Sequence, residues 1–329
     1  MNLGNVTNTA ITAPPTGVRK VPELSLSSYS GGSNLDRQKF IDDFYLGLKD
    51  YGFIVLKDHP IPDGLLNKAY ALVEEFFALP TEKKMTYALK DRGFQRGYTP
   101  FGTEHAKDAK VSDLKEFWHV GRELTPGHRY ETDYPKNVWP AEVPEFEKTM
   151  KTIFTALDET GKIMLEALTQ PLDLHKTFFS EMMGEGNSIL RLLHYPPIPP
   201  TADPRSVRAA AHEDINLITI LVSATSSGLQ LKDRDGTWLP IESEPNTLVV
   251  DAGDMLARIT NEVIPSTTHR VVNPEDAKTS RYSMPYFIHP NPDALLTCLP
   301  SCKGTGEKYA PITAQDFLMQ RLREIGLLK

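Results

Sequence analysis

The stretch RAAAHEDINLITILV, from Arg208 to Val222, joins two potential metal-binding side chains to a predicted β-strand. Its apolar half continues to residue 224 and is short and rich in β-branched residues, which favours a strand. His212 and Asp214 stand two residues apart at its edge, and side chains at i and i+2 share one face of a strand. Such a pair also occurs by chance on protein surfaces, so a metal site needs support from elsewhere in the chain.

That support comes from the sequence that follows. His269 lies beyond a run of predicted strands that would return the chain to the same end of a barrel. Two histidines and one carboxylate leave coordination positions open, which suits an iron(II) oxygenase. Arg281 and Ser283 again share one strand face, and a guanidinium beside a hydroxyl makes a good anion clamp. We therefore expect a metal on His212, Asp214 and His269, with a carboxylate bound nearby.

The periodicity of the chain predicts a mainly β fold with flanking helices. Predicted strands separated by turn residues occupy 217–224, 228–233, 237–241, 247–253, 255–260 and 281–289. This pattern indicates an antiparallel barrel or jelly roll. Helical spacing of apolar residues predicts helices over 40–52, 65–80 and 150–172, with a strand at 53–59. Residues 86–145 show no clear period and are expected to form loops that line a cleft.

Composition excludes several classes of partner. The 329 residues carry a net charge of -7, with 43 acidic against 36 basic residues, and the absence of a long basic run argues against nucleic acid. No run of about 18 apolar residues occurs, so we expect no membrane span. Two cysteines are too few for a disulfide scaffold and fit a reducing compartment. We therefore expect a cytoplasmic protein that binds a small molecule, while its oligomeric state is left open.

The sequence resembles the isopenicillin N synthase branch of the iron(II)/2-oxoglutarate-dependent dioxygenases. The resemblance covers nearly the whole chain and includes the arrangement of His269, Arg281 and Ser283. The other matching motifs are DYGFIVLKDHPIP (50–62), FFALPTEKK (76–84), RGY (96–98), LKEFW (114–118), LLHYPP (192–197), HEDINLITILV (212–222) and GLQL (228–231).

The resemblance implies a double-stranded β-helix (jelly-roll) core with iron(II) on the metal triad. It also implies that Arg281 and Ser283 hold the distal carboxylate of 2-oxoglutarate, assisted by Tyr195. Such an enzyme uses O₂ to convert 2-oxoglutarate to succinate while it oxidises a small organic substrate, with hydroxylation expected. Residues 1–20 are rich in Thr, Asn, Pro and Gly and show no periodicity, so we expect a flexible arm there. The rest of the chain is expected to form an N-terminal α/β region (21–150), the oxygenase core with its supporting helix (151–290), and a C-terminal loop and helix (291–329).

Two other functions stay open at this point. Isopenicillin N synthase is a four-electron oxidase that uses no 2-oxoglutarate, because its substrate carboxylate occupies the same clamp, so Arg281 and Ser283 do not separate the two chemistries. The C-terminal RLREIGLLK lacks the glutamine that the synthase carries there, which weakens a penicillin-forming assignment. A binding module that kept the fold without catalysis is a more distant alternative, because the triad and the clamp are complete.

Two residues are candidates for contact with the substrate. Arg96 resembles an arginine that binds the substrate carboxylate in isopenicillin N synthase, and this suggests a carboxylate-bearing substrate. The alternative is an arginine on the surface of a loop. Phe287 shares a strand face with Ser283 and would wall the active site. His119 would line the same pocket, although a structural histidine with satisfied hydrogen bonds is the better explanation.

Overall fold

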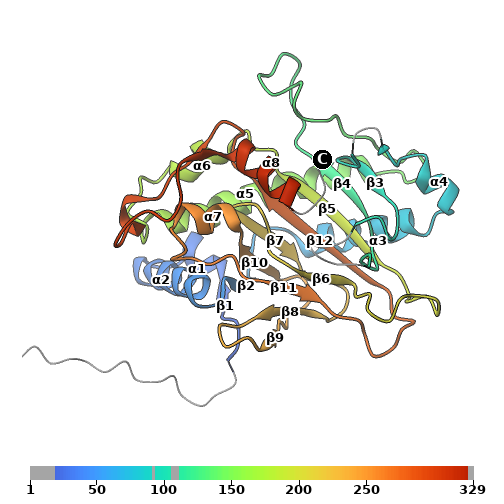
Figure 1. The fold of residues 1–329 in the computed structure, drawn as a ribbon, viewed down its shortest axis with the longest axis horizontal. Helices are drawn as coiled ribbons and strands as arrows, with labels where there is room; N and C mark the ends of the chain where they lie inside the picture. The colour runs from blue at the N-terminus through green and yellow to red at the C-terminus, as the bar shows by residue number, and fades with distance from the viewer. Residues whose placement is uncertain (1–18, 91–92, 105–110, 325–329) are drawn as a thin grey trace, which may run out of the picture.

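Two β-sheets face each other at the centre of the molecule, with helices packed against the outside of the larger one (Figure 1). The computed structural model describes residues 19–90, 93–104 and 111–324. Apart from Arg19 and Lys20, the predicted flexible arm lies outside these residues. The mainly β architecture with flanking helices agrees with the sequence prediction.

The larger sheet has eight strands in the described part of the chain, in the order β1-β2-β10-β7-β12-β5-β4-β3. A four-stranded sheet in the order β6-β11-β8-β9 lies opposite, and β13 pairs with β14. The strands of the larger sheet are β1 (Glu23–Ser25), β2 (Phe53–Lys57), β3 (Gly97–Thr99), β4 (Glu116–Gly121), β5 (Ile189–Tyr195), β7 (Ile218–Val222), β10 (Leu248–Ala252) and β12 (Arg281–Ile288). The others are β6 (Ala209–His212), β8 (Leu229–Lys232), β9 (Trp238–Pro240), β11 (His269–Val271), β13 (Leu295–Leu296) and β14 (Ile312–Thr313).

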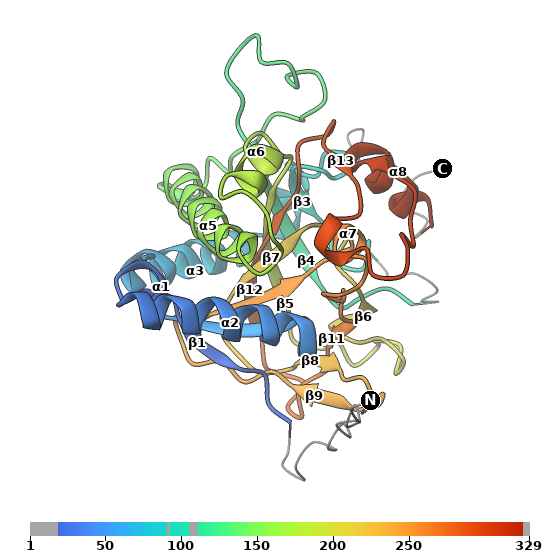
Figure 2. The same cartoon turned by 90° about the vertical axis from the view of Figure 1, so that its left-hand side faces the viewer.

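Helices gather on one side of the larger sheet, where α2, α3 and α5 contact its strands (Figure 2). The helices are α1 (Leu26–Ser30), α2 (Asn34–Tyr51), α3 (Asp63–Phe77), α4 (Thr81–Met85), α5 (Phe146–Thr169), α6 (Phe178–Met183), α7 (Asp254–Ile259) and α8 (Ala314–Glu324), with a 3₁₀ turn η2 (Pro300–Cys302). Ser33 caps α2 through a capping box with Asp36, and Gly52 ends it in the left-handed conformation. None of the described helices combines the length and apolar character that a membrane crossing requires.

Successive side chains of each strand in the larger sheet point to opposite faces, so the strands contribute to two separate apolar clusters. On β2, Ile54 and Leu56 join the cluster beneath the helices, whereas Phe53 and Val55 join the cluster between the two sheets. β12 follows the same rule, because Met284, Tyr286 and Ile288 face the helix layer. Its alternate residues, which begin with Arg281, must therefore face the space between the sheets.

Residues 86–145, predicted to be irregular, supply two strands to the larger sheet. β4 pairs with β5 along its whole length, and β3 pairs with β4. A buried charged cluster stabilises this edge, because Glu116 accepts hydrogen bonds from Lys84 (2.8 Å) and Tyr98 and lies 2.7 Å from the ring of His194. β4 was not predicted because a pattern of hydrophobic residues does not reveal a strand that buries charged residues.

The prediction of a strand over 255–260 is wrong, because helix α7 covers residues 254–259. Gly253 stands at its N-cap and Asp254 in its first turn, where a negative charge favours a helix. Met255, Leu256 and Ala257 are consecutive, buried and good helix formers. A short apolar run does not separate a buried helix from a buried strand by periodicity alone.

Gly253 allows the turn after β10 to approach the segment that carries Asp214. Its N–H donates to Leu217 O at 3.0 Å. An added Cβ would lie 2.2 Å from Asn216 Oδ1 and 2.4 Å from the backbone oxygen of Asn216. We expect Gly253→Ala to lower the free energy of unfolding by about 1–3 kcal/mol, because the backbone must shift.

Thermal and urea unfolding of the purified variant would measure this loss. Gly64→Ala is the matched control, because an added Cβ there has no atom within 4 Å. A Gly253→Ala protein as stable as the Gly64→Ala protein would show that the turn tolerates a side chain.

Candidate metal centre

The smaller sheet brings the predicted metal ligands together. His212 ends β6 and His269 begins β11, and the two residues are direct partners across these antiparallel strands. Asp214 follows β6 in the loop that leads to β7, and Asp254 N–H binds its backbone oxygen at 2.7 Å. Residues far apart in sequence thus meet because the register pairs the two histidines.

The three side chains converge on one point. Asp214 Oδ1 lies 3.7 Å from His212 Nε2 and 3.9 Å from His269 Nε2. One ligand atom from each residue lies within 4.8 Å of the others. Donor atoms that each lie about 2.1 Å from one ion are about 3 Å apart when they occupy neighbouring coordination positions. A small inward movement of the side chains would therefore let one ion bind all three. The donor set fits a first-row transition metal.

Hydrogen bonds on the far side of each imidazole orient the donor atoms. His212 Nδ1 lies 2.7 Å from Ala210 O, and His269 Nδ1 lies 3.2 Å from Thr267 O. A proton on each Nδ1 donates to these carbonyls, which leaves the Nε2 lone pair for a metal. Burial, followed by the neighbouring His269, lowers the pKa of His212 to about 4, which keeps its ring neutral.

The carboxylate of Asp214 is held from behind. Thr219 donates its hydroxyl hydrogen to Asp214 Oδ2, and Asn216 Nδ2 donates to Thr219 Oγ1 at 2.9 Å. Asp251 is also buried here, and burial followed by the charge of Asp214 raises its pKa well above the ordinary value. Neither Thr219 nor Asp251 was predicted from the sequence to belong to the site.

A cavity of about 70 Å³ connects this cluster to the predicted carboxylate clamp. Arg281, Ser283 and Tyr195 line it together with the metal triad. Arg281 Nη1 donates to Ser283 Oγ at 3.2 Å, and its guanidinium lies 5.0 Å from the ring centroid of Tyr195, its partner across β5 and β12. The fold thus places the clamp and the triad around one cavity.

The two candidate substrate residues differ in position. Phe287 lines the cavity, on the same face as Ser283. Arg96 is fully buried and does not line this cavity; it donates to Gln95 O at 2.7 Å and to Asn187 Oδ1 at 3.0 Å. It lies against Gly121, where an added Cβ would come within 1.9 Å of the guanidinium. Arg96 is therefore not a surface arginine.

Two further charged residues, Arg191 and Lys115, line the cavity, and sequence reasoning did not find them. The sequence could have indicated Arg191, because it shares a strand face with Leu193 and with Tyr195, a predicted site residue, in RLLHY (191–195). Arg191 Nε donates to His119 Nε2 at 2.7 Å, and the other ring nitrogen of His119 lies 3.3 Å from Phe94 O. Both nitrogens of His119 are thus satisfied, as expected for a structural histidine.

Comparison with known proteins now identifies the family. Residues 186–290 match the 2OG-Fe(II) oxygenase superfamily, and residues 21–142 match the family described as non-haem dioxygenase in morphine synthesis N-terminal. The 2-oxoglutarate-Fe(II) type oxidoreductase hxnY of Emericella nidulans is 33% identical over 320 residues, which cover 94% of this chain and 89% of hxnY. The chain belongs to the 2OG-Fe(II) oxygenase family.

Solved structures of other 2OG-Fe(II) oxygenases share this fold. A family member from Caulobacter crescentus is 45% identical, with a TM-score of 0.83 over 92% of this chain and 98% of that one. Neurospora crassa T7H in complex with alpha-KG and thymine is 31% identical, with a TM-score of 0.82 over 92% of this chain and 96% of that one. These relationships confirm the predicted jelly-roll core and the predicted non-haem dioxygenase, with iron(II), 2-oxoglutarate and O₂ as its cofactor and co-substrates.

We expect Thr219→Val to raise the dissociation constant for iron(II) about tenfold, because groups that orient metal ligands typically change affinity by 10- to 100-fold. Valine removes the hydrogen bond to Asp214 without changing the size of the side chain much. Thr219→Ser is the matched control, because it keeps the hydroxyl. Anaerobic iron titration would measure both variants, and a valine variant that binds iron like the wild type would show that Asp214 needs no such support.

Proposed function

We propose that His212, Asp214 and His269 hold the iron(II) and that Arg281 and Ser283 bind the distal carboxylate of 2-oxoglutarate. Tyr195 lies at the same end of the cavity and supports that carboxylate. One observation carries the proposal: a single cavity joins the three metal-ligand side chains to a buried guanidinium. Within the described residues Arg281 has no carboxylate partner, and a buried cation of this kind calls for an anionic ligand.

In this proposal the enzyme couples the conversion of 2-oxoglutarate to succinate with the hydroxylation of a small organic substrate. Bound iron supplies the redox chemistry that activates O₂. The chain's own contribution is geometric: it leaves one side of the triad open to the cavity, orients each ligand from behind, and surrounds the reacting groups with apolar walls. Leu193, Leu221 and Phe287 are among these walls.

The substrate is proposed to lie against Phe287. The complex of Neurospora crassa T7H with alpha-KG and thymine supports a small, flat substrate. A carboxylate on the substrate, bound by Arg96, is the alternative taken from the sequence. Arg96 is buried against Gly121 and is not among the residues that line the cavity, which does not favour this alternative.

The division into regions, the branch of the family and the cellular location are also proposed, each on separate grounds. The division into regions 21–150 and 151–290 is supported by family matches over 21–142 and 186–290. Placement in the isopenicillin N synthase-like branch is supported by the sequence motifs. A cytoplasmic location is supported by the two cysteines, Cys298 and Cys302, which are both free thiols.

An anaerobic titration tests the proposed co-substrate site. Protein loaded with iron(II) should develop a weak visible charge-transfer band when 2-oxoglutarate is added, because a keto acid bound beside the iron would share electrons with it. Succinate, which lacks the keto group, is the control and should give no band. Absence of a band with 2-oxoglutarate at saturating iron would refute the proposed site.

A further inference from the structure

The two ends of the cavity differ in how their positive charges are balanced. At the 2-oxoglutarate end, Arg281 Nε donates to Ser226 O at 3.0 Å. Arg208, which does not itself line the cavity, donates to Thr279 O. Both guanidiniums lie near the ring of Tyr195, at 5.0 and 5.9 Å from its centroid. Neither has a carboxylate partner within the described residues, and Nε and Nη1 of Arg208 are buried without any partner there. This end is therefore suited to an anion.

At the other end, Arg191 is held on several sides. Its guanidinium carbon lies 4.3 Å from the ring centroid of Phe117 and 5.4 Å from that of Phe287. Nε donates to His119 Nε2, and Nη1 donates to Glu104 Oε1 and Oε2 at 3.3 and 3.2 Å. Nη2 has no partner among the described residues. One donor of a rigidly held cation is thus left for a ligand in the cavity.

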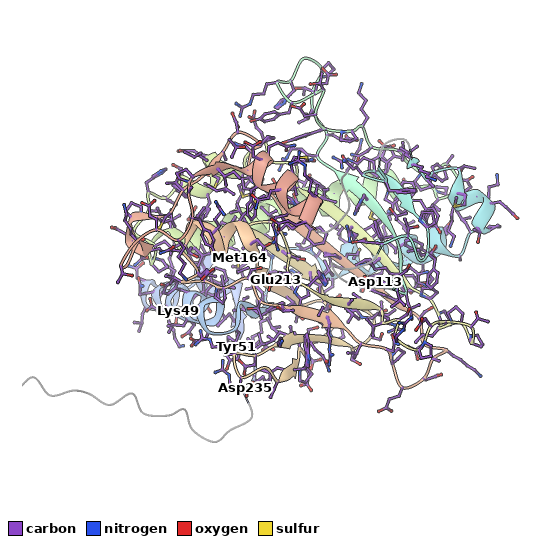
Figure 3. All side chains as sticks on the ribbon, viewed as in Figure 1. Lys49, Tyr51, Asp113, Met164, Glu213 and Asp235 are labelled. Carbon is purple, nitrogen blue, oxygen red and sulfur yellow. The ribbon has the colours of Figure 1, made fainter. Side chains whose placement is uncertain are left out.

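The positive charge at this end is already neutralised. Lys115 Nζ lies 2.9 Å from Asp113 and 3.8 Å from Glu104, so Arg191 and Lys115 face two carboxylates. Asp113, labelled in Figure 3, lies on the loop before β4. Burial opposes ionisation of Glu104, but the charges of Arg191 and then Lys115 prevail and lower its pKa to about 2. Glu104 is therefore anionic at neutral pH.

We infer that the substrate oxidised by this enzyme is an uncharged, flat molecule whose carbonyl oxygen accepts a hydrogen bond from Arg191 Nη2, and that Glu104 selects against carboxylates. This inference rests on the proposed function, which assigns the opposite end of the cavity to 2-oxoglutarate. Arg191 would act as a binding residue, and His119 as a positioning residue that fixes its Nε.

The preference follows from desolvation and charge. A neutral carbonyl gains a charge-assisted hydrogen bond from Arg191 and loses little hydration. A carboxylate would lose much more hydration, and it would lie close to Glu104, which already occupies the other side of the guanidinium. Asp251 adds a negative charge when ionised and none when protonated, so neither of its states favours an anion. The flat wall formed by Phe287 favours a planar ring.

Matched probe pairs of nearly equal shape test this preference. The pairs are benzamide with benzoate, and uracil-5-carboxamide with uracil-5-carboxylate. Each probe is titrated anaerobically into the complete protein holding iron(II) and 2-oxoglutarate, and binding is followed by the change in the charge-transfer band. Formation of that band before any probe is added confirms that the protein is folded and that the proposed 2-oxoglutarate site is intact.

We expect the wild type to bind at least one amide about tenfold more tightly than its carboxylate, a ratio typical of one charge-assisted hydrogen bond. Glu104→Gln should shrink this ratio about tenfold or reverse it. Arg191→Gln should weaken amide binding about tenfold and leave the affinity for 2-oxoglutarate unchanged. Arg205→Gln is the control, because Arg205 is exposed and paired with Asp203.

Three results would overturn the inference while leaving the proposed function standing. They are equal or tighter binding of the carboxylates by the wild type, an unchanged ratio in Glu104→Gln, and a normal charge-transfer band with no response to either amide at millimolar concentration. Loss of the band itself in the wild type would instead contradict the proposed function.

Discussion

Asp214→Ala is expected to abolish turnover, with kcat/KM at least about a thousandfold below the wild type, because bound metal supplies several kcal/mol of stabilisation in such reactions. Alanine removes the only carboxylate in the proposed ligand set and leaves two imidazoles. Iron binding, followed anaerobically, should be lost together with succinate formation.

Measurements of thermal stability distinguish loss of iron binding in Asp214→Ala from loss of the folded state. Asp214 and Asp251 are both buried, and Asp214 contributes to the raised pKa of Asp251, so removal of one carboxylate relieves repulsion. The metal-free variant should therefore melt no lower than the metal-free wild type, while the stabilisation that added iron gives the wild type disappears. Glu213→Ala is the control. Glu213 stands between His212 and Asp214 in the sequence, but it is exposed and accepts a hydrogen bond from Thr268. Normal iron binding by Asp214→Ala would contradict the proposed ligand set.

Arg281→Leu is expected to raise the dissociation constant for 2-oxoglutarate about a hundredfold, because it removes charge-assisted hydrogen bonds worth roughly 3 kcal/mol. The dissociation constant of Arg281→Lys for 2-oxoglutarate should lie between those of Arg281→Leu and the wild type, since lysine keeps the charge but not the planar pair of donors. The anaerobic charge-transfer titration measures both affinities, and iron binding should be unchanged.

A second arginine controls for general effects of losing a guanidinium. Arg270 follows His269 on β11, but it donates to Gln230 at 2.9 Å and stacks 3.9 Å from the ring centroid of Trp238 rather than lining the cavity. Arg270→Leu should bind 2-oxoglutarate like the wild type. If Arg281→Leu did the same, the keto acid would have to bind elsewhere.

The sequence predicted those parts of the site that lie on single strands. A spacing of two residues is enough to place Arg281 with Ser283, because alternation along β12 fixes the face of each side chain. The same spacing correctly paired His212 with Asp214, although Asp214 lies in the loop after β6 and not on a strand. The pairing of His212 with His269 required only that β11 return beside β6, which the series of short strands already suggested. Local periodicity thus carries most of the information for these residues.

Three other features were not predicted, two of them because they depend on contacts between distant parts of the chain. Arg191 is an isolated charge in an apolar strand until His119 and Glu104 arrive from distant parts of the chain. β4 was hidden because its buried Glu116 is satisfied by Lys84 and Tyr98, which also lie far from it in sequence. Helix α7 was mistaken for a strand because a six-residue apolar segment is too short to show its period.

The stoichiometry of turnover tests the central claim most directly. Aerobic reactions with iron(II), 2-oxoglutarate and an accepted substrate should form succinate and oxidised product in equimolar amounts with the O₂ consumed, and Asp214→Ala should form neither. Oxidised product that accumulates without succinate, or succinate formation by Asp214→Ala at the wild-type rate, would contradict the account.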